Sequence, residues 1–207
     1  MCSLKMIAII DYGMGNIHSV QKALESLGAT TAVTNKPEAI QACSKLVLPG
    51  VGAFRDAMLE LEKQNLISVI KEEVGKKKIF LGICLGMQLL FPESQEAKAC
   101  PRLGILKGKV KQLDYKQGIK VPHIGWNRLK EVSPGCPLFK NIADNSFVYF
   151  CHSYYPVPDD KNIIGATVHY GMDFAAVVWQ ENVLGIQFHP EKSQKVGLEM
   201  LKNFVEM

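Results

Sequence analysis

Two hydrophobic periodicities alternate along the first half of the chain. Short runs of apolar and β-branched residues are typical of buried strands, whereas apolar residues three or four positions apart are typical of helices that bury one face. The strand-like runs are 6–11, 30–34, 45–48 and 78–81, and the helical stretches between and after them are 16–27, a short one from Pro37, 53–74, and one that stops near Pro92. This rhythm predicts a parallel sheet with helices on both faces.

Two of these helices carry the residues that usually mark helix ends. Asn16 can cap the first helix, and Gly28 stands just past its end. Pro37 takes the first-turn position of the second helix, where its fixed φ is favourable. The apolar face of the first helix is formed by Ile17, Val20, Leu24 and Leu27.

The second half of the chain is richer in strand-like runs. They lie at 108–113, 121–126, 147–150, 163–169, 175–179 and 183–188, and a helix with one apolar face follows from Gln194. We expect these strands to extend the sheet and to add an antiparallel portion. No internal repeat, low-complexity tract or long linker divides the chain, so we predict an α/β fold with one domain over residues 1–207.

Composition and charge exclude several classes of protein. The 207 residues are 47% hydrophobic and 21% charged, which is ordinary for a globular chain, and the run Met6–Ile10 is too short for a membrane span or a secretory signal. We therefore expect a cytoplasmic protein that contacts no membrane. The net charge of +4 is dispersed, and the one tight basic run, Lys76–Lys78, fits a solvated turn better than a nucleic-acid footprint.

The six cysteines stand at positions 2, 43, 84, 100, 136 and 151, and no pair has the C-x-x-C spacing. Neither a zinc site nor a thioredoxin motif is indicated, and we predict no metal and no cofactor. Most of these cysteines are expected to be inert small hydrophobes.

Cys84 is the exception because of its setting. It lies between Gly82 and Gly86, after a buried strand and before a helix, which is the form of a nucleophile elbow. In such a turn the nucleophile adopts strained backbone angles, and side chains two positions away would crowd it. The helix N-terminus lowers a thiol pKa, and the next amide, that of Leu85, is placed to stabilise an oxyanion.

A base for that thiol is suggested by His189-Pro190-Glu191, which follows the strand at 183–188. A cysteine nucleophile needs a base, and the base needs a group that fixes its orientation. In a doubly wound sheet ligands bind at the carboxyl edge of the strands, where Cys84 should also lie. The residues alone thus predict acyl transfer from an amide or an ester.

Two glycine-rich turns follow strand-like runs, and the one after 45–48 lies at the same predicted edge. Pro49-Gly50-Val51-Gly52 can present backbone donors to a ligand, and our functional interpretation is a second oxyanion donor from Gly52 or its neighbour, with a plain tight turn as the alternative. The turn is no phosphate loop, because Gly-Lys-Ser/Thr is missing. Residues 11–16 lack the third glycine of a dinucleotide fingerprint, and His18 stands in its place.

The segment 149–154 ends another strand and holds a rival pair, Cys151 and His152. Adjacent strand residues point to opposite faces, which argues against that pairing. For His123 and Trp126 the sequence leaves packing and partner contact equally open.

Residues 82–88 together with 189–191 resemble the class I (triad) glutamine amidotransferases. The stretches 10–16, 48–54, 122–127 and 149–154 resemble, within that class, the glutaminase subunits of the synthase that makes imidazole glycerol phosphate in histidine biosynthesis. The resemblance spans essentially the whole chain, apart from the leader at residues 1–5. It implies the known fold of that class and an enzyme that acts on glutamine.

The resemblance also implies a role for each matching residue. Cys84 attacks the glutamine carboxamide, His189 moves the proton, Glu191 orients His189, and the amides of Gly52 and Leu85 stabilise the oxyanion. The substrate-binding residues would be Gln88, Ser153 and Tyr154, with Gly50 nearby. Trp126, Tyr149 and Lys192 would lie towards the partner.

The partner implied by the resemblance is a (β/α)8-barrel cyclase subunit that forms a heterodimer with this chain. It would take up the ammonia and stimulate a glutaminase that is nearly silent alone. The alternatives are a glutaminase with another ammonia acceptor, a free-standing cysteine hydrolase, and a non-enzymatic binding module. The last would be expected to lack Cys84, His189 or Glu191, and all three are present.

Overall fold

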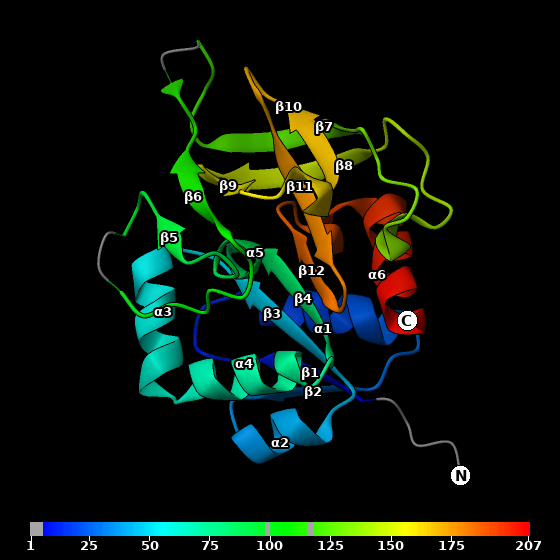
Figure 1. The fold of residues 1–207 in the computed structure, drawn as a ribbon. Coiled ribbons are helices and arrows are strands. Elements are labelled where there is room, and N and C mark those ends of the chain that lie inside the picture. Colours follow the sequence, from blue (N-terminus) through cyan, green and yellow to red (C-terminus); the bar gives the residue numbers. More distant parts are fainter. Residues whose placement is uncertain (1–5, 98–99, 116–117) are drawn as a thin grey trace.

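A computed structural model describes residues 6–97, 100–115 and 118–207 of the chain. Its centre is a nine-stranded sheet with the order β2-β1-β3-β4-β12-β11-β10-β7-β8, and a three-stranded sheet, β5-β6-β9, lies beside it (Figure 1). The strands of the large sheet are β1 (Ile7–Ile10), β2 (Thr31–Thr34), β3 (Lys45–Gly50), β4 (Ile79–Cys84), β7 (His123–Lys130), β8 (Phe147–His152), β10 (Ile164–His169), β11 (Asp173–Gln180) and β12 (Val183–Ile186). The small sheet consists of β5 (Glu93–Ser94), β6 (Gly108–Gln112) and β9 (Tyr154–Pro158).

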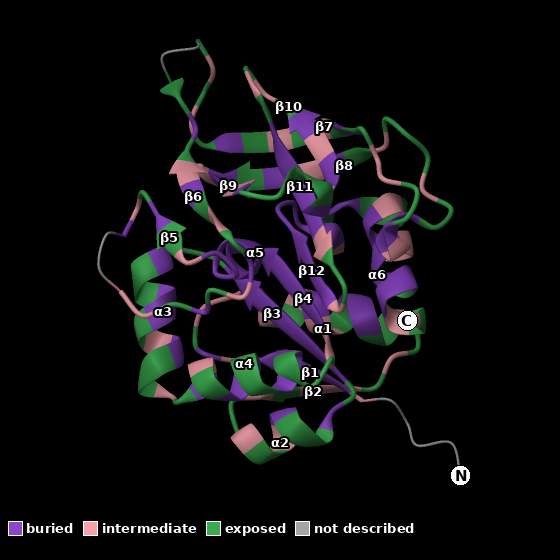
Figure 2. Cartoon of the chain, viewed as in Figure 1, coloured by how far each residue is buried: buried purple, intermediate pink, exposed green. Residues whose placement is uncertain are grey.

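The first five strands of the large sheet, β2 to β12 in sheet order, are parallel, and the remaining pairs are antiparallel. The predicted parallel sheet with an antiparallel portion is therefore confirmed. The register places Gly50 of β3 opposite Cys84 of β4, so both stand at the carboxyl edge. These central strands are buried on both faces, as strands covered by helices must be (Figure 2).

Helices cover both faces, and the alternation of β1 shows which covers which. Ala8 and Ile10 pack in one core with the buried residues of α2 (Pro37–Ala42), α3 (Phe54–Lys63) and α4 (Leu66–Gly75). Ile7 and Ile9 pack in the other core with α1 (Ile17–Ser26) and α6 (Gln194–Glu206).

Several boundaries differ from those expected. The stretch 53–74 is two helices, separated at Asn65, whose φ of 57° is left-handed. Asn16 occupies the N-cap position of α1 but makes no cap hydrogen bond through its side chain. The helix after Cys84, α5, is only Leu85–Gln88.

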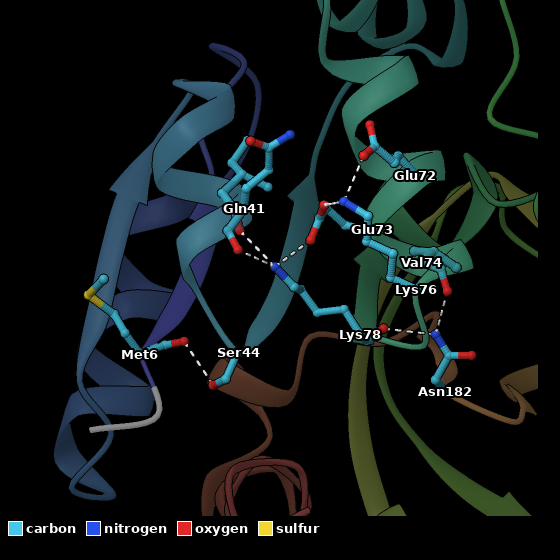
Figure 3. A network of polar contacts seen from close by, with 10 residues as sticks. Met6, Gln41, Ser44, Glu72, Glu73, Val74, Lys76, Lys78 and Asn182 are labelled. Atoms are coloured by element: carbon cyan, nitrogen blue, oxygen red, sulfur yellow. Dashed lines mark hydrogen bonds and ion pairs between the residues drawn. The ribbon is translucent and has the colours of Figure 1, made fainter. Parts of the chain in front are cut away.

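The edge of the sheet opposite Cys84 is held by a buried ion pair (Figure 3). Lys78, just before β4, lies with its Nζ 2.6 Å from Glu73 Oε2 of α4 and donates to the carbonyls of Ile40 and Gln41 in α2 at 3.2 and 2.8 Å. Burial alone would raise the pKa of Glu73, but the hydrogen bonds and charges of Lys76 and Lys78 outweigh it and hold the pKa below its usual range. This cluster fixes two helices to the strand whose far end carries Cys84.

The residues at 1–5, which form the leader noted in the sequence, lie outside the described part of the chain. Within the described ranges, no helix is long and apolar enough to cross a membrane.

Candidate active site

The geometry around Cys84 is that of a nucleophile elbow. Its φ of 56° and ψ of −109° lie in a region that side-chain-bearing residues rarely adopt. A Cβ at Gly86 would stand 1.8 Å from the carbonyl oxygen of Leu48, and one at Gly82 would stand 2.5 Å from that of Gly86. The turn can close only with glycine at both positions, which is the physical reason that the sequence pattern suggested.

His189 and Glu191 stand together beside this turn. His189 Nδ1 is 2.9 Å from Glu191 Oε1, and both side chains are buried. Because a carboxylate can only accept, Nδ1 carries a proton and Nε2 is left to face the thiol. Burial alone would lower the pKa of His189, but hydrogen bonds to Cys84 and Glu191, and the charges of both, raise it to about 10. The site therefore favours a protonated His189 imidazole, which lies between the Cys84 sulfur and the Glu191 carboxylate.

Two buried oxygens at the site, the Tyr12 hydroxyl and Glu191 Oε2, have no hydrogen-bond partner among the described residues. A Cβ at Gly50 would stand 2.6 Å from the Tyr12 hydroxyl and 3.0 Å from the Leu85 side chain. Gly50 is thus required where β3 passes under Cys84. Close packing therefore explains why residue 50 is glycine. Gly50 is not among the residues of the pocket wall described below.

A pocket of about 330 Å³ opens in front of Cys84. That volume is at the small end of the range for ligand sites, roughly 300–1,000 Å³. Besides Cys84 and His189, its wall includes the predicted oxyanion, substrate and partner residues Gly52, Leu85, Gln88, Ser153, Tyr154 and Lys192, together with the rival pair Cys151 and His152. Gly52 has a φ of 97°, so glycine is favoured there for its backbone conformation. Lys192, expected towards a partner, contributes to the pocket.

Gln88 is oriented by two acceptors. Its Nε2 donates to the carbonyl of Tyr154 at 2.9 Å and to Gln187 Oε1 at 3.2 Å. The group that Gln88 can offer a ligand is therefore its own carbonyl oxygen.

Two residues of the site were missed by the sequence reasoning. Glu96 lines the pocket, and its Oε2 accepts from the backbone N–H of Phe54 at 2.9 Å, which caps α3. Gln187 is fully buried behind Cys84, with its Nε2 3.9 Å from the sulfur. No pattern marks Glu96, whereas Gln187 stands only two residues before His189 and could have been weighed with it.

The rival pair is separated as strand geometry predicts. Cys151 is exposed, and its sulfur belongs to the outer face of β8, while His152 is buried. His152 Nδ1 lies 2.9 Å from the carbonyl of Tyr154, and His123 Nδ1 lies 3.1 Å from His152 Nε2. Burial is the main reason that the pKa of His152 falls to about 3 and that of His123 to about 4. His123 is a packed core residue.

Trp126 lies on the outer face of the same hairpin, with its ring 5.9 Å from that of Tyr149. Across the described ranges, no three or more His, Cys, Asp or Glu side chains are grouped so as to hold a metal ion.

A family model described as glutamine amidotransferase class-I matches residues 8–207, and the chain belongs to that family. Solved structures show the shared fold. One described as a glutamine amidotransferase has a TM-score of 0.75 at 19% identity and covers 96% of this chain and 97% of its own. Another, described as PurLQS from Thermotoga maritima, has a TM-score of 0.72 at 19% identity, with coverage of 98% and 96%.

Closer relatives carry one name. The imidazole glycerol phosphate synthase subunit HisH of Syntrophotalea carbinolica is 48% identical over 207 residues, covering 98% of this chain and 100% of that protein. The HisH subunit of Moorella thermoacetica is 48% identical over 204 residues, covering 99% and 96%.

Proposed function

We propose that this protein is the glutaminase subunit of an imidazole glycerol phosphate synthase. The observation that carries the proposal is the elbow cysteine beside a His189–Glu191 pair at a pocket, in a chain that is 48% identical to a HisH subunit over 98% of its length. That arrangement supplies a thiol nucleophile, a base, and a carboxylate that orients the base.

The reaction runs in two steps. The Cys84 thiolate attacks the carboxamide carbon of glutamine, the amides of Gly52 and Leu85 hold the oxyanion, and the C–N bond breaks as His189 gives its proton to the departing ammonia. Water, deprotonated by His189, then attacks the γ-glutamyl thioester. The C–S bond breaks, and glutamate leaves with the thiolate restored.

The pocket wall matches a substrate that carries both charges. Glu96 offers a carboxylate and Gln88 a carbonyl oxygen to the α-ammonium group of glutamine. Lys192 offers a cation to its α-carboxylate, with Ser153 and Tyr154 beside it. We assign Glu96 and Lys192 to substrate recognition on this ground.

The outer face of the β7–β8 hairpin is the surface we assign to the partner. Ile124, Trp126 and Phe147 are 59%, 46% and 47% exposed there, next to Tyr149 and Cys151. An exposed apolar patch of this kind marks a contact surface. It borders the pocket, because Cys151 also belongs to the pocket wall.

The partner is a (β/α)8-barrel cyclase subunit. It takes the ammonia and a phosphoribulosyl-formimino carboxamide ribotide, and it forms imidazole glycerol phosphate and an aminoimidazole carboxamide ribotide.

The test is glutamate release from glutamine by the purified chain, alone and with a cyclase barrel and its ribotide. We expect slow release alone, a large rise with the liganded barrel, and none from Cys84→Ala. Fast release without a partner, or no response to the barrel, would instead indicate a free-standing hydrolase or a glutaminase with another acceptor.

A further inference from the structure

Gln187 stands directly after β12, and its fully buried side chain bridges two residues of the site. Its Nε2 lies 3.9 Å from Cys84 Sγ, within hydrogen-bond reach of a sulfur, and its Oε1 accepts from Gln88 at 3.2 Å. Since the amide nitrogen and oxygen of a glutamine are hard to tell apart by shape, the question is which of them faces the sulfur.

The carbonyl of Tyr154 fixes the orientation of both glutamine amides. A backbone carbonyl only accepts, so the group of Gln88 that faces it at 2.9 Å is the NH₂. The same NH₂ faces Gln187, which must therefore present its oxygen to Gln88. The other end of Gln187, the one beside Cys84, is then a donor.

This orientation is fixed by further buried groups. The Tyr154 carbonyl also accepts from His152 Nδ1, whose Nε2 in turn accepts from His123 Nδ1. His123 and His152 are both buried, so the polar chain that ends at the sulfur begins in the β7–β8 hairpin.

We propose that Gln187 is a further catalytic residue, which donates its Nε2–H to the sulfur of Cys84 and stabilises the thiolate. A hydrogen bond to the charged form of a group favours that form. The Cys84 sulfur also donates to the carbonyl of Cys151 at 3.9 Å, a contact that favours the neutral thiol, and the donor of Gln187 opposes it by favouring the thiolate. The inference rests on the proposed function, in which the thiolate is the nucleophile.

The titratable and charged groups around the sulfur come from several elements. None of them is itself replaced when Gln187 is substituted. They are His189 and Glu191 after β12, His152 in β8, Tyr12 after β1, and Glu96, Tyr154 and Lys192 on the pocket wall.

The experiment measures alkylation of Cys84 by iodoacetamide against pH, in the full chain, with the Cys84 peptide quantified by mass spectrometry. Gln187→Met removes the donor while keeping the shape. We expect the midpoint of its alkylation profile to rise by about one pH unit, a tenfold weaker preference for the thiolate. Gln187→Glu places a carboxylate there and should raise the midpoint further.

The control is Asn203→Leu, which removes another buried amide, one that donates to the carbonyls of Leu138 and Lys140 at 2.9 and 2.7 Å, outside the pocket wall. It should lower stability without moving the midpoint. If Gln187→Met does not fold, Gln187→Glu carries the test alone. An unmoved midpoint in the Gln187 variants overturns the proposal, even if their glutaminase activity falls. The readout needs neither glutamine nor a partner, so failure of the proposed function would show separately, in the glutamate assay.

Discussion

The carboxylate of Glu191 sets the tautomer of neutral His189. It holds the proton on Nδ1, so that Nε2 is free to accept a proton from the thiol. Glu191→Gln replaces the acceptor by an amide, which can present its NH₂ to Nδ1 and force the proton onto the wrong nitrogen. Loss of the orienting acid in this way costs roughly a thousandfold to ten-thousandfold in kcat. We expect that loss in glutamate release measured with the liganded partner. Glu96→Gln, by contrast, should mainly raise KM, and an equal loss of kcat in both variants would contradict the assigned roles.

Individual site residues could be predicted from the sequence where the local geometry of the chain determines their role. The flanking glycines of Cys84 and the pair His189–Glu191 follow from the chemistry of a turn and of a base. Glu96 and Gln187 could not be predicted with the same force, because their positions beside Cys84 depend on how distant segments pack. Gly50 was expected near the substrate, but its close contact with Tyr12 explains the glycine without it.

The buried ion pair of Glu73 in α4 with Lys78, just before β4, gives a prediction for the stability of the fold. Glu73 is 3% exposed in its side chain and pairs with Lys78, which is 11% exposed. Glu73→Gln leaves the cation of Lys78 buried without a counter-charge, so we expect a loss of about 3 kcal/mol in the free energy of unfolding. Urea unfolding of Glu72→Gln is the matched control, since Glu72 also pairs with Lys76 but is 56% exposed. Equal losses in both variants would show that burial of the pair is unimportant.

The buried histidines of the β7–β8 hairpin make the free energy of unfolding depend on pH. Burial lowers the pKa of His123 to about 4 and that of His152 to about 3, so the folded state binds fewer protons than the unfolded state, whose histidines titrate near 6.5. Their contribution to stability is therefore full above that value and falls as pH drops from about 6.5 towards 4 for His123 and towards 3 for His152. Between pH 7 and 5 we expect a loss of about 2 kcal/mol for each histidine.

Urea unfolding at the two pH values measures this loss. His123→Gln should reduce the acid-induced loss by the share of one histidine, about 2 kcal/mol, whereas His18→Gln, at an exposed position of α1, should leave it unchanged. The same acid sensitivity in His123→Gln as in the wild type would contradict the assignment.

The elements that the sequence missed have identifiable causes. Strand β9 contains Pro156 and Pro158, which argue against a central strand, and it is an edge strand of the small sheet, where proline is tolerated. Strand β5 is two residues long. The break at Asn65 carries neither glycine nor proline, so periodicity continued through it.

The whole molecule places its pocket and its exposed aromatic patch on neighbouring surfaces. An aromatic side chain at the centre of an interface can contribute about 2 kcal/mol or more to binding. Trp126→Ala should therefore weaken binding of the cyclase barrel at least about thirtyfold in calorimetric titration, with the melting temperature of the free chain little changed. Val33→Ala, an exposed apolar position on the opposite edge strand β2, is the control and should bind normally. Unchanged affinity in Trp126→Ala would show that the partner binds a different surface.

The parallel sheet, its two helical layers and the antiparallel extension were all predictable from the alternation of strand and helix patterns. The location of the pocket followed from the carboxyl edge of that sheet. Several residues of its wall, such as Gln88, Ser153 and Tyr154, were named through the family resemblance, whereas Glu96 was not, because it reaches the site from the segment that follows β5 of the small sheet.

In the proposed reaction, glutamine is cleaved through a covalent thioester on Cys84. The direct measurement is acid quenching of the complex during turnover of isotopically labelled glutamine, followed by peptide mass spectrometry. We predict the γ-glutamyl label on the peptide that contains Cys84, and no label in Cys84→Ala. Label on the peptide that contains Cys151, or turnover by Cys84→Ala without any labelled peptide, would contradict this mechanism.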